Sequence, residues 1–249
     1  DAHIAWAMLN DTDADGALGF AFYPGDDPYQ AGSITTVSQG SHRDAGGNLL
    51  TADILQEGSY YYLTFTHELG HAVGLKHPHS TAGSGSYAVF PGVTGSANGG
   101  DNNLNSTPWT VMTYNDSTSV NGLTPGTSTD NGYLMNLGAF DVAAVQYLYG
   151  PNLTTNSTDT TYNLDTSLTG YKTIWDAGGT DLIDASTLST AVNIDLRNAT
   201  LEEEAGGGGF ASKIDSAQKG YVIAHNSTGS AVIENATGGN GADTLTGNE

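Results

Sequence analysis

Four histidines and a glutamate lie within THELGHAVGLKHPHS, residues 66–80, of a chain that holds only 7 histidines in 249 residues. Residues four apart on a helix share one face, so His67 and His71 can hold one ion between them. Glu68 lies beside them, close enough to act on a water bound to that ion. After a glycine turns the chain, His77 can supply a third nitrogen. Three neutral imidazoles with one open position describe a catalytic zinc site, because a fourth protein ligand would close a structural one.

The chemistry of such a site follows from the ion. Zinc lowers the pKa of a bound water towards neutrality, and Glu68 would take its proton and later pass it to a leaving amine. The competing interpretation is a helix whose histidines are only satisfied polar residues. The full pattern His-Glu-x-x-His-x-x-Gly-x-x-His is present rather than its five-residue core alone, which favours the metal site. His79, two residues past His77, is interpreted as a solvent-facing or supporting histidine and not as a ligand.

Hydrophobic periodicity predicts the elements that would position these residues. A helix is expected from Tyr60 to Val73, with Gly74 ending it, and a second one from Leu134 to Tyr149. Residues 78–110 have the composition of a loop. Alternating and β-branched runs predict short strands at 3–9, 16–25, 33–39, 173–179, 180–186, 191–197, 220–226 and 231–237.

The amino-acid composition divides the chain into two parts. Residues 1–150 carry the aromatic residues and the helical patterns, whereas residues 151–249 are rich in Gly, Thr, Asn and Asp. The chain closes on GGNGADTLTGNE, which fits one unit of the glycine–aspartate nonapeptide repeat of parallel β-rolls. Two domains are therefore expected, and further turns of a roll are expected beyond residue 249.

Charge excludes several classes of function. Lys and Arg number 6 against 27 Asp and Glu, a formal net charge of -21. Such a surface repels nucleic acid and anionic membranes and favours divalent cations. No run of 18 apolar residues exists, so membrane insertion is not expected. There is no cysteine, which fits a cytosolic protein and equally a secreted protein that is stabilised by calcium rather than by disulfides.

HELGHAVGLKH, residues 67–77, resembles the extended zinc-binding motif of the metzincin metalloproteases, and TVMTY, residues 110–114, resembles their Met-turn. The proline after His77, the VMTY form of the turn and FDVAAVQYLYG at 140–150 are most similar to the serralysins, secreted bacterial zinc endopeptidases with a C-terminal calcium-binding β-roll. The resemblance covers the chain from about Ala17 onward. It implies an α+β fold: a metzincin catalytic domain over 1–150, with a twisted sheet and an active-site helix, then a parallel β-roll or β-sandwich over 151–249.

The resemblance also implies roles for single residues. His67, His71 and His77 would bind one catalytic Zn²⁺, with Glu68 as the general base. Met112 matches the Met-turn methionine that packs under the zinc. Tyr114 matches a tyrosine that ligates zinc in the resting enzyme and swings to stabilise the oxyanion, which a phenol near zinc can do by donating to the tetrahedral intermediate. Without the resemblance, Tyr114 could equally be a core aromatic residue, and Met112 would usually be interpreted as a core residue.

Two or more structural Ca²⁺ ions are implied in the same way. WDAGGTD, residues 175–181, resembles the first calcium-binding turn of the serralysin roll. The family pairs it with Arg-x-Gly-x-Thr upstream, from which this chain departs at Asn156 and Thr158. Glycines permit left-handed turns that point carbonyls inward, and aspartates supply hard oxygen ligands. The implied ligands are Asn156, Thr158, Thr160, Asp176, Gly178 and Asp181 for one ion, Gly179, Asp181, Glu234 and the Val232 carbonyl for a second, and Gly239, Gly241 and Asp243 for half of a repeat-type site. Acidic turns without metal are the alternative.

Asp11, Asp13 and Asp15 match the first half of an EF-hand loop, but Phe22 occupies the position of the bidentate acid. An Asp-rich turn without an ion is therefore expected there.

The family's catalytic domain starts earlier than this chain, with a long helix and strands. We expect a missing segment, a second chain or a rearranged N-terminus to cover the sheet. Protein substrates are expected to lie extended along an edge strand, and secretion by the bacterial type I route is expected. A non-catalytic, calcium-dependent surface or adhesion module that retains a metal site remains the alternative, although Glu68 counts against it. A metzincin of another branch would not explain the WDAGGTD and GGNGADTL segments.

Overall fold

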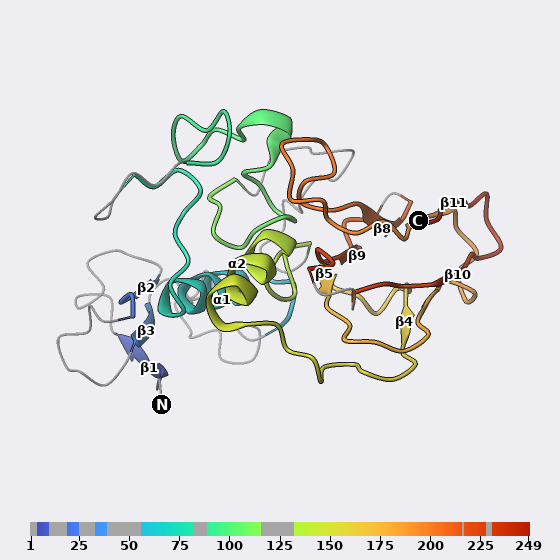
Figure 1. The fold of residues 1–249 in the computed structure, drawn as a ribbon, viewed down its shortest axis with the longest axis horizontal. Coiled ribbons are helices and arrows are strands. Elements are labelled where there is room, and N and C mark those ends of the chain that lie inside the picture. The colour runs from blue at the N-terminus through green and yellow to red at the C-terminus, as the bar shows by residue number, and fades with distance from the viewer. Residues whose placement is uncertain are drawn as a thin grey trace, which may run out of the picture.

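A computed structural model describes residues 4–9, 19–24, 33–38, 56–81, 89–115, 132–215, 217–227 and 231–249. Two helices lie between a small N-terminal sheet and two C-terminal sheets (Figure 1). This mixture agrees with the expected α+β fold. The turn containing Asp11, Asp13 and Asp15 lies outside the described residues. Within the described part of the chain, neither helix has the length and apolar character needed to cross a bilayer.

The N-terminal sheet has the strand order β1-β3-β2. β1 (Ile4–Leu9) is parallel to β3 (Ser33–Ser38), and β2 (Gly19–Ala21) pairs antiparallel with β3 at the edge. β2 ends at Ala21, earlier than the predicted run 16–25, and Pro24 follows three residues later. The side chains of β1 and β3 beyond Ile4 are outside the description, so the expected cover of this sheet stays a prediction.

The first helix, α1 (Tyr60–Ala72), carries the zinc motif and packs on β2 and β3. It begins at Ser59, whose hydroxyl accepts a 3.1 Å hydrogen bond from the Tyr62 amide and so satisfies one free N–H of the first turn. It ends at Val73, and Gly74 follows with a φ of 99°, a left-handed conformation that favours glycine. The predicted helix is confirmed to within one residue.

The second helix, α2 (Ala139–Tyr149), is shorter than predicted. Residues 134–138 are not helical because part of this segment pairs with the chain at Tyr171. The Tyr171 amide donates to the Tyr133 carbonyl at 3.0 Å, and the Met135 amide donates to the Tyr171 carbonyl at 2.7 Å. Tertiary pairing thus overrides the helical periodicity of the segment. Among the described residues of the loop between the helices, one 3-10 turn (Asp101–Asn103) is found.

The C-terminal part is built from two sheets. One has the order β10-β6-β4, with all neighbours parallel: β4 (Thr161–Asn163), β6 (Leu182–Asp184) and β10 (Asn235–Thr237). The other has the order β11-β7-β8-β9-β5: β5 (Tyr171–Ile174), β7 (Val192–Asp195), β8 (Ala211–Ile214), β9 (Gly220–Ile223) and β11 (Thr244–Thr246). β6, β7, β9 and β10 lie within predicted runs and are shorter than predicted, whereas β5 shares only residues 173–174 with the predicted run 173–179. β4, β8 and β11 were not predicted as strands.

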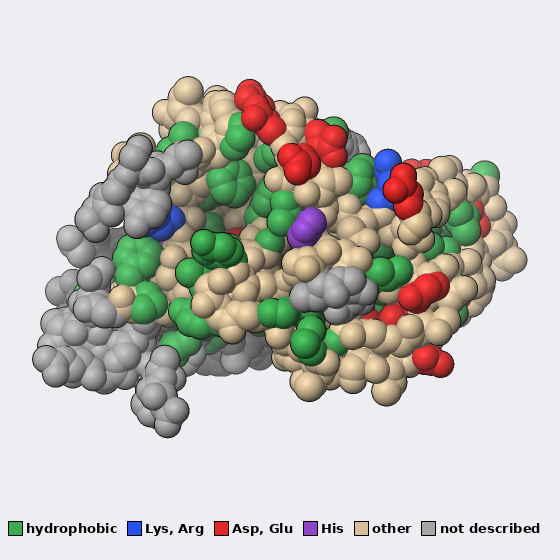
Figure 2. Space-filling model, in the orientation of Figure 1, with side chains coloured by type: hydrophobic (Ala, Val, Ile, Leu, Met, Phe, Trp, Pro, Cys, Tyr) green, Lys and Arg blue, Asp and Glu red, His purple; other side chains and the backbone are tan. Residues whose placement is uncertain are grey.

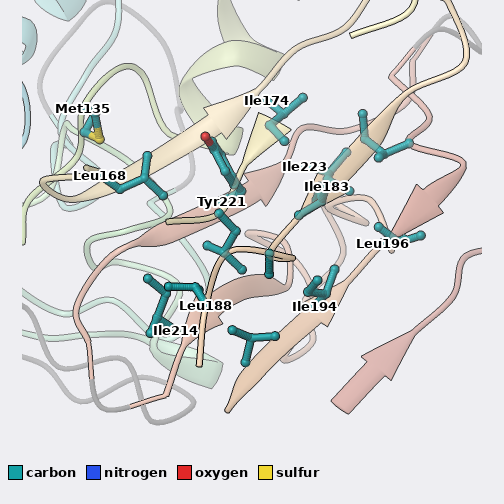
Figure 3. Packing of buried hydrophobic residues seen from close by; sticks show 14 residues of the cluster. Met135, Leu168, Ile174, Ile183, Leu188, Ile194, Leu196, Ile214, Tyr221 and Ile223 are labelled. Carbon is teal, nitrogen blue, oxygen red and sulfur yellow. The ribbon is translucent and has the colours of Figure 1, made fainter. Parts of the chain in front are cut away.

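Two apolar clusters form the core. The first fills the space between the C-terminal strands and includes Ile183, Ile194 and Ile223 (Figure 3). The second joins residues from both halves of the chain, since Trp109 and Met112 cluster with Tyr171, Ala199 and Val222. The segment 109–112 is therefore buried directly against the C-terminal part. Acidic side chains lie in separate groups on the face seen in Figure 2.

Candidate metal centre

Three histidine nitrogens converge at the C-terminal end of α1. The Nε2 atom of His77 lies 3.1 Å from that of His67 and 3.1 Å from that of His71. His67 and His71 come from successive turns of α1, and His77 from the loop after Gly74. The ligand atoms of the three lie within 4.8 Å of one another, close enough to hold one metal ion. The structure thus brings together the three histidines that the spacing predicts.

Hydrogen bonds set the tautomers of the two helical histidines. Nδ1 of His67 bonds to the Val111 carbonyl at 2.7 Å, and Nδ1 of His71 bonds to the Leu75 carbonyl at 2.8 Å. A carbonyl only accepts, so Nδ1 carries the proton in both rings. This leaves a lone pair on each Nε2 facing the common point, which is the form of imidazole that binds metals.

The local electrostatics keep the rings neutral. Burial, and then the neighbouring imidazoles, lower the pKa of His67 to about 4 and that of His77 to about 3. Burial also lowers the pKa of His71. Neutral rings at pH 7 need no proton removed before they bind an ion, and a cation at the common point would relieve the repulsion between their lone pairs.

Glu68 is buried on α1 beside the histidines, and its Oε2 has no hydrogen-bond partner among the described residues. Burial raises the pKa of this carboxyl to about 7. A buried carboxyl that titrates near neutrality has the pKa that general acid–base catalysis at pH 7 requires. The charge of a bound ion would favour the ionised form.

Tyr114 lies over the histidines. Its ring centroid is 4.6 Å from that of His77, 5.7 Å from that of His67 and 5.3 Å from that of His79. The side chain is 57% exposed, so it can be reached from solvent. Burial of part of the ring, followed by the nearby Glu68 and two other tyrosines, raises the pKa of the phenol. It therefore keeps its proton at neutral pH and can donate a hydrogen bond.

Met112 packs beneath the helix. Its side chain is 2% exposed, and a methyl group added at Gly70 would overlap its sulfur. Gly70 lies between His67 and His71 on α1, so the methionine supports the stretch of helix that carries both rings. Gly70 occupies an unspecified position of the motif, and this close approach explains why a residue without a side chain is found there.

Asp141 is a residue that the sequence reasoning missed. Its fully buried carboxylate accepts hydrogen bonds from the Gly138 amide at 2.8 Å, the Val111 amide at 2.7 Å and the Thr110 hydroxyl at 2.6 Å. It thereby caps α2 and ties that helix to the segment that orients His67. Burial raises the pKa of Asp141 to about 6, although the three hydrogen bonds act to lower it. Asp141 lies in the first turn of α2, but the helix was expected to begin at Leu134, so the position of Asp141 did not indicate a cap.

Comparison with known proteins identifies the family. A model described as reprolysin-like metallopeptidase, family M12B, matches residues 7–142, and a model of the serralysin C-terminal domain of the M10 peptidases matches residues 140–249. The chain belongs to the serralysin-type metallopeptidases. The predicted family is thus confirmed, and the serralysin model of the C-terminal part separates it from other metzincin branches, in agreement with the WDAGGTD and GGNGADTL segments.

Serralysin-type relatives match nearly the whole chain. It is 32% identical to Serralysin B of Dickeya chrysanthemi over 98% of this chain and 47% of that protein. It is 34% identical to Serralysin of Proteus mirabilis over 77% of this chain and 36% of that protein. The Metallopeptidase AprA of Pseudomonas marginalis is 29% identical over 100% of this chain and 48% of that protein. The chain spans about half the length of the curated relatives it matches.

The serralysin-type C-terminal part holds a second cluster of candidate ligands. Asp176 and Asp181 are both fully buried, and Oδ2 of Asp181 has no hydrogen-bond partner among the described residues. Burial, and then the nearby Asp176 and Glu234, raise the pKa of Asp181 to about 6, against the lowering effect of a bond from the Thr160 amide. Two buried carboxyl groups, one of them with an oxygen that has no hydrogen-bond partner, are stable together only if a proton or a cation compensates their charge.

Other predicted calcium residues surround these aspartates. Oε2 of Glu234 accepts a 2.7 Å bond from the Asp181 amide. Gly179, with a φ of 143°, touches the backbone at Thr158, and the Asp176 carboxylate accepts from the amide of Gly178 at 2.9 Å.

Tyr162 was not predicted at this cluster. Its hydroxyl donates to Asp176 at 2.6 Å and accepts from Nδ2 of Asn156 at 2.9 Å. The asparagine side chain therefore reaches the buried aspartate only through the tyrosine. No spacing rule pointed to Tyr162, because its partner is fourteen positions away, in the loop between β5 and β6.

The remaining predicted calcium residues lie apart. Asp243 accepts a 3.1 Å bond from the Val192 amide, and Gly239 and Gly241 lie against the chain at Leu188 and Ala191. Val232 lines a surface hollow with Arg197 and Asn248. The structure therefore groups the candidates into a cluster around Asp176 and Asp181 and a separate turn around Asp243.

Proposed function

We propose that this chain is the catalytic part of a zinc endopeptidase that hydrolyses peptide bonds in extended protein substrates. The observation that carries the proposal is the convergence of three neutral Nε2 atoms beside a buried, unpartnered Glu68. The donor set fits zinc, which prefers imidazole nitrogen and, in catalytic sites, three protein ligands with one open position. A bound zinc would supply Lewis acidity, polarising the scissile carbonyl and acidifying a water.

Each residue then has one task. His67, His71 and His77 hold the ion, and the Val111 and Leu75 carbonyls keep two of these rings oriented. Glu68 accepts the proton of the attacking water and delivers it to the leaving amine. Tyr114, protonated and exposed, donates a hydrogen bond to the oxyanion of the tetrahedral intermediate and can ligate the ion at rest. Met112 supports the helix from below.

The substrate would pair with β2. This strand is at the edge of the N-terminal sheet and contacts α1. Tyr23 follows it, with a ring centroid 5.6 Å from that of His71, so an extended chain added beside β2 would run towards the histidines. Backbone pairing of this kind demands little of the substrate side chains.

The same proposal covers the C-terminal part. We divide the chain into a catalytic domain over 1–150 and a calcium-binding domain over 151–249, and place two or more structural Ca²⁺ ions in the latter. The buried pair Asp176 and Asp181 supports the first site. Secretion through the type I route follows from the family and belongs to the proposal. The non-catalytic adhesion module is not favoured, because the candidate base is retained beside the histidines.

Casein hydrolysis tests the function. With zinc and calcium supplied, the protein should cleave casein, and a zinc chelator should abolish cleavage reversibly. Glu68→Gln should lose on the order of 10²-fold or more in rate while keeping its zinc, because the residue moves a proton and is not a ligand. Glu57→Gln is the matched control. Glu57 is exposed, and its carboxylate lies 3.9 Å from the Lys172 ammonium group, in a weak ion pair. An inert wild type would refute the endopeptidase, and a fully active Glu68→Gln would refute the mechanism.

A further inference from the structure

The third candidate ligand is held differently from the other two. His67 and His71 each donate from Nδ1 to a backbone carbonyl, but among the described residues His77 has no such acceptor. Its ring is instead stacked on His79, with 5.0 Å between centroids and 15° between ring planes. Metal-bound imidazoles normally have their orientation set by a hydrogen bond from the second nitrogen. Stacking therefore replaces that bond at the ligand that comes from a loop.

The loop after α1 fixes the positions of the His77 and His79 rings relative to one another. His77 and His79 flank a buried proline, Pro78. The Ser80 amide donates to the His77 carbonyl at 3.0 Å, and the Phe90 amide donates to the Pro78 carbonyl at 3.0 Å. A turn closed at both points leaves little freedom in the separation of the two side chains, so the position of one ring limits the position of the other.

His79 also contacts the candidate catalytic phenol. The centroids of His77, His79 and Tyr114 are mutually 4.6 to 5.3 Å apart. Nδ1 of His79 is buried and has no hydrogen-bond partner among the described residues, and the ring of His79 contacts those of His77 and Tyr114. His79, which is not itself a candidate ligand, therefore forms one side of the site occupied by the Tyr114 ring.

We propose that His79 is a positioning residue of the metal centre that acts through ring contacts alone. Its contact with His77 holds that ring in the ligating orientation, and its contact with Tyr114 limits the position of the phenol. The inference rests on the proposed zinc site. It gives the fourth histidine of the motif region a role that neither the zinc-binding pattern nor the spacing of the ligands assigns.

The test compares His79→Phe, which keeps a flat ring, with His79→Ala, which removes it. Zinc affinity is measured by competition with a chromophoric chelator, and the ligand geometry by the visible spectrum of the Co²⁺-loaded protein. His79→Ala should bind zinc on the order of 10-fold more weakly, the usual cost of losing a group that orients a ligand, and should shift the cobalt bands. His79→Phe should stay within about threefold of wild type with an unshifted spectrum.

Controls separate this role from general folding. His225→Ala removes a histidine that bonds the Ala199 carbonyl away from the centre and should leave both readouts unchanged. Unchanged zinc affinity and spectrum in His79→Ala would overturn the proposal, and so would a His79→Phe protein as impaired as His79→Ala, because the nitrogen would then matter. Failure of the wild type to bind zinc would instead refute the proposed function, so the two failures are distinguishable.

Discussion

The carboxylate of Asp141 accepts a 2.7 Å hydrogen bond from the backbone amide of Val111. The carbonyl of the same Val111 accepts a 2.7 Å bond from His67, so the start of α2 and a candidate zinc ligand bond to one residue of the Met-turn. Asp141 is fully buried, with its charge compensated by three donors. The turn beneath the metal centre is therefore held by a residue of α2 that lies thirty positions after Val111.

Asp141 gives the fold a specific pH dependence. Its pKa is about 6 in the native state against an ordinary 3.8, so between these values the folded protein holds a proton that the unfolded chain has released. Stability from this group therefore falls as pH rises through the window and is constant above it. Asp141→Asn removes the titration, and its stability relative to wild type should rise by about 2 kcal/mol from pH 4 to pH 7, because one unit of pKa shift corresponds to about 1.4 kcal/mol and part of the titration lies below pH 4.

Urea unfolding of both proteins across pH 4 to 7, with zinc and calcium held constant, measures this difference. The histidines titrate in both proteins, so their effect cancels in the comparison. A difference that does not change with pH would mean that the pKa of Asp141 is not raised.

Gly70→Ala should destabilise the protein. The added methyl would overlap the Met112 sulfur, and overpacking a buried contact costs about 1–3 kcal/mol. The helix propensity of alanine would offset at most about 1 kcal/mol of this. Gly95→Ala is the control, because a methyl there meets no atom within 4 Å. Chemical denaturation of the two variants would contradict the packing account if both matched wild type.

Tyr114→Phe should lower the turnover of a peptide substrate on the order of 10²-fold, the usual cost of losing one oxyanion donor. Zinc affinity should change little, because three histidines remain. Tyr147→Phe, at a side chain 91% exposed on α2, should behave as wild type. Steady-state kinetics with zinc titration separate the cases: a loss of zinc rather than of turnover in Tyr114→Phe would assign the phenol to the metal alone.

Calcium should stabilise the C-terminal part. A ligand that binds only the folded state adds about 2.7 kcal/mol at 100 times its Kd, so the melting temperature should rise with calcium and fall with a calcium chelator. Asp181→Asn should lose most of this response, because it removes charge from the buried pair. Asp215→Asn, at an exposed turn, should keep it. Equal responses in the two variants would place the stabilising ions elsewhere.

The sequence by itself determined the local structure of this protein. Periodicity and the glycine at 74 predicted α1 almost to the residue, and the motif spacing predicted which three nitrogens meet, because neighbours on a helix are set by backbone geometry alone. Alternation likewise predicted most strands after residue 150.

Only the tertiary structure decided which contacts hold the helices and the candidate site residues in place. The extended pairing of Tyr133 and Met135 with Tyr171 shortened α2. The Asp141 carboxylate bonds to the Val111 amide, and the Tyr162 hydroxyl bonds to Asp176 in the loop after β5. His79 differs, since it is close to His77 in sequence yet has its role through ring stacking. Hydrogen bonds and ring contacts between segments depend on how the elements pack together, and no residue spacing within one element carries that information.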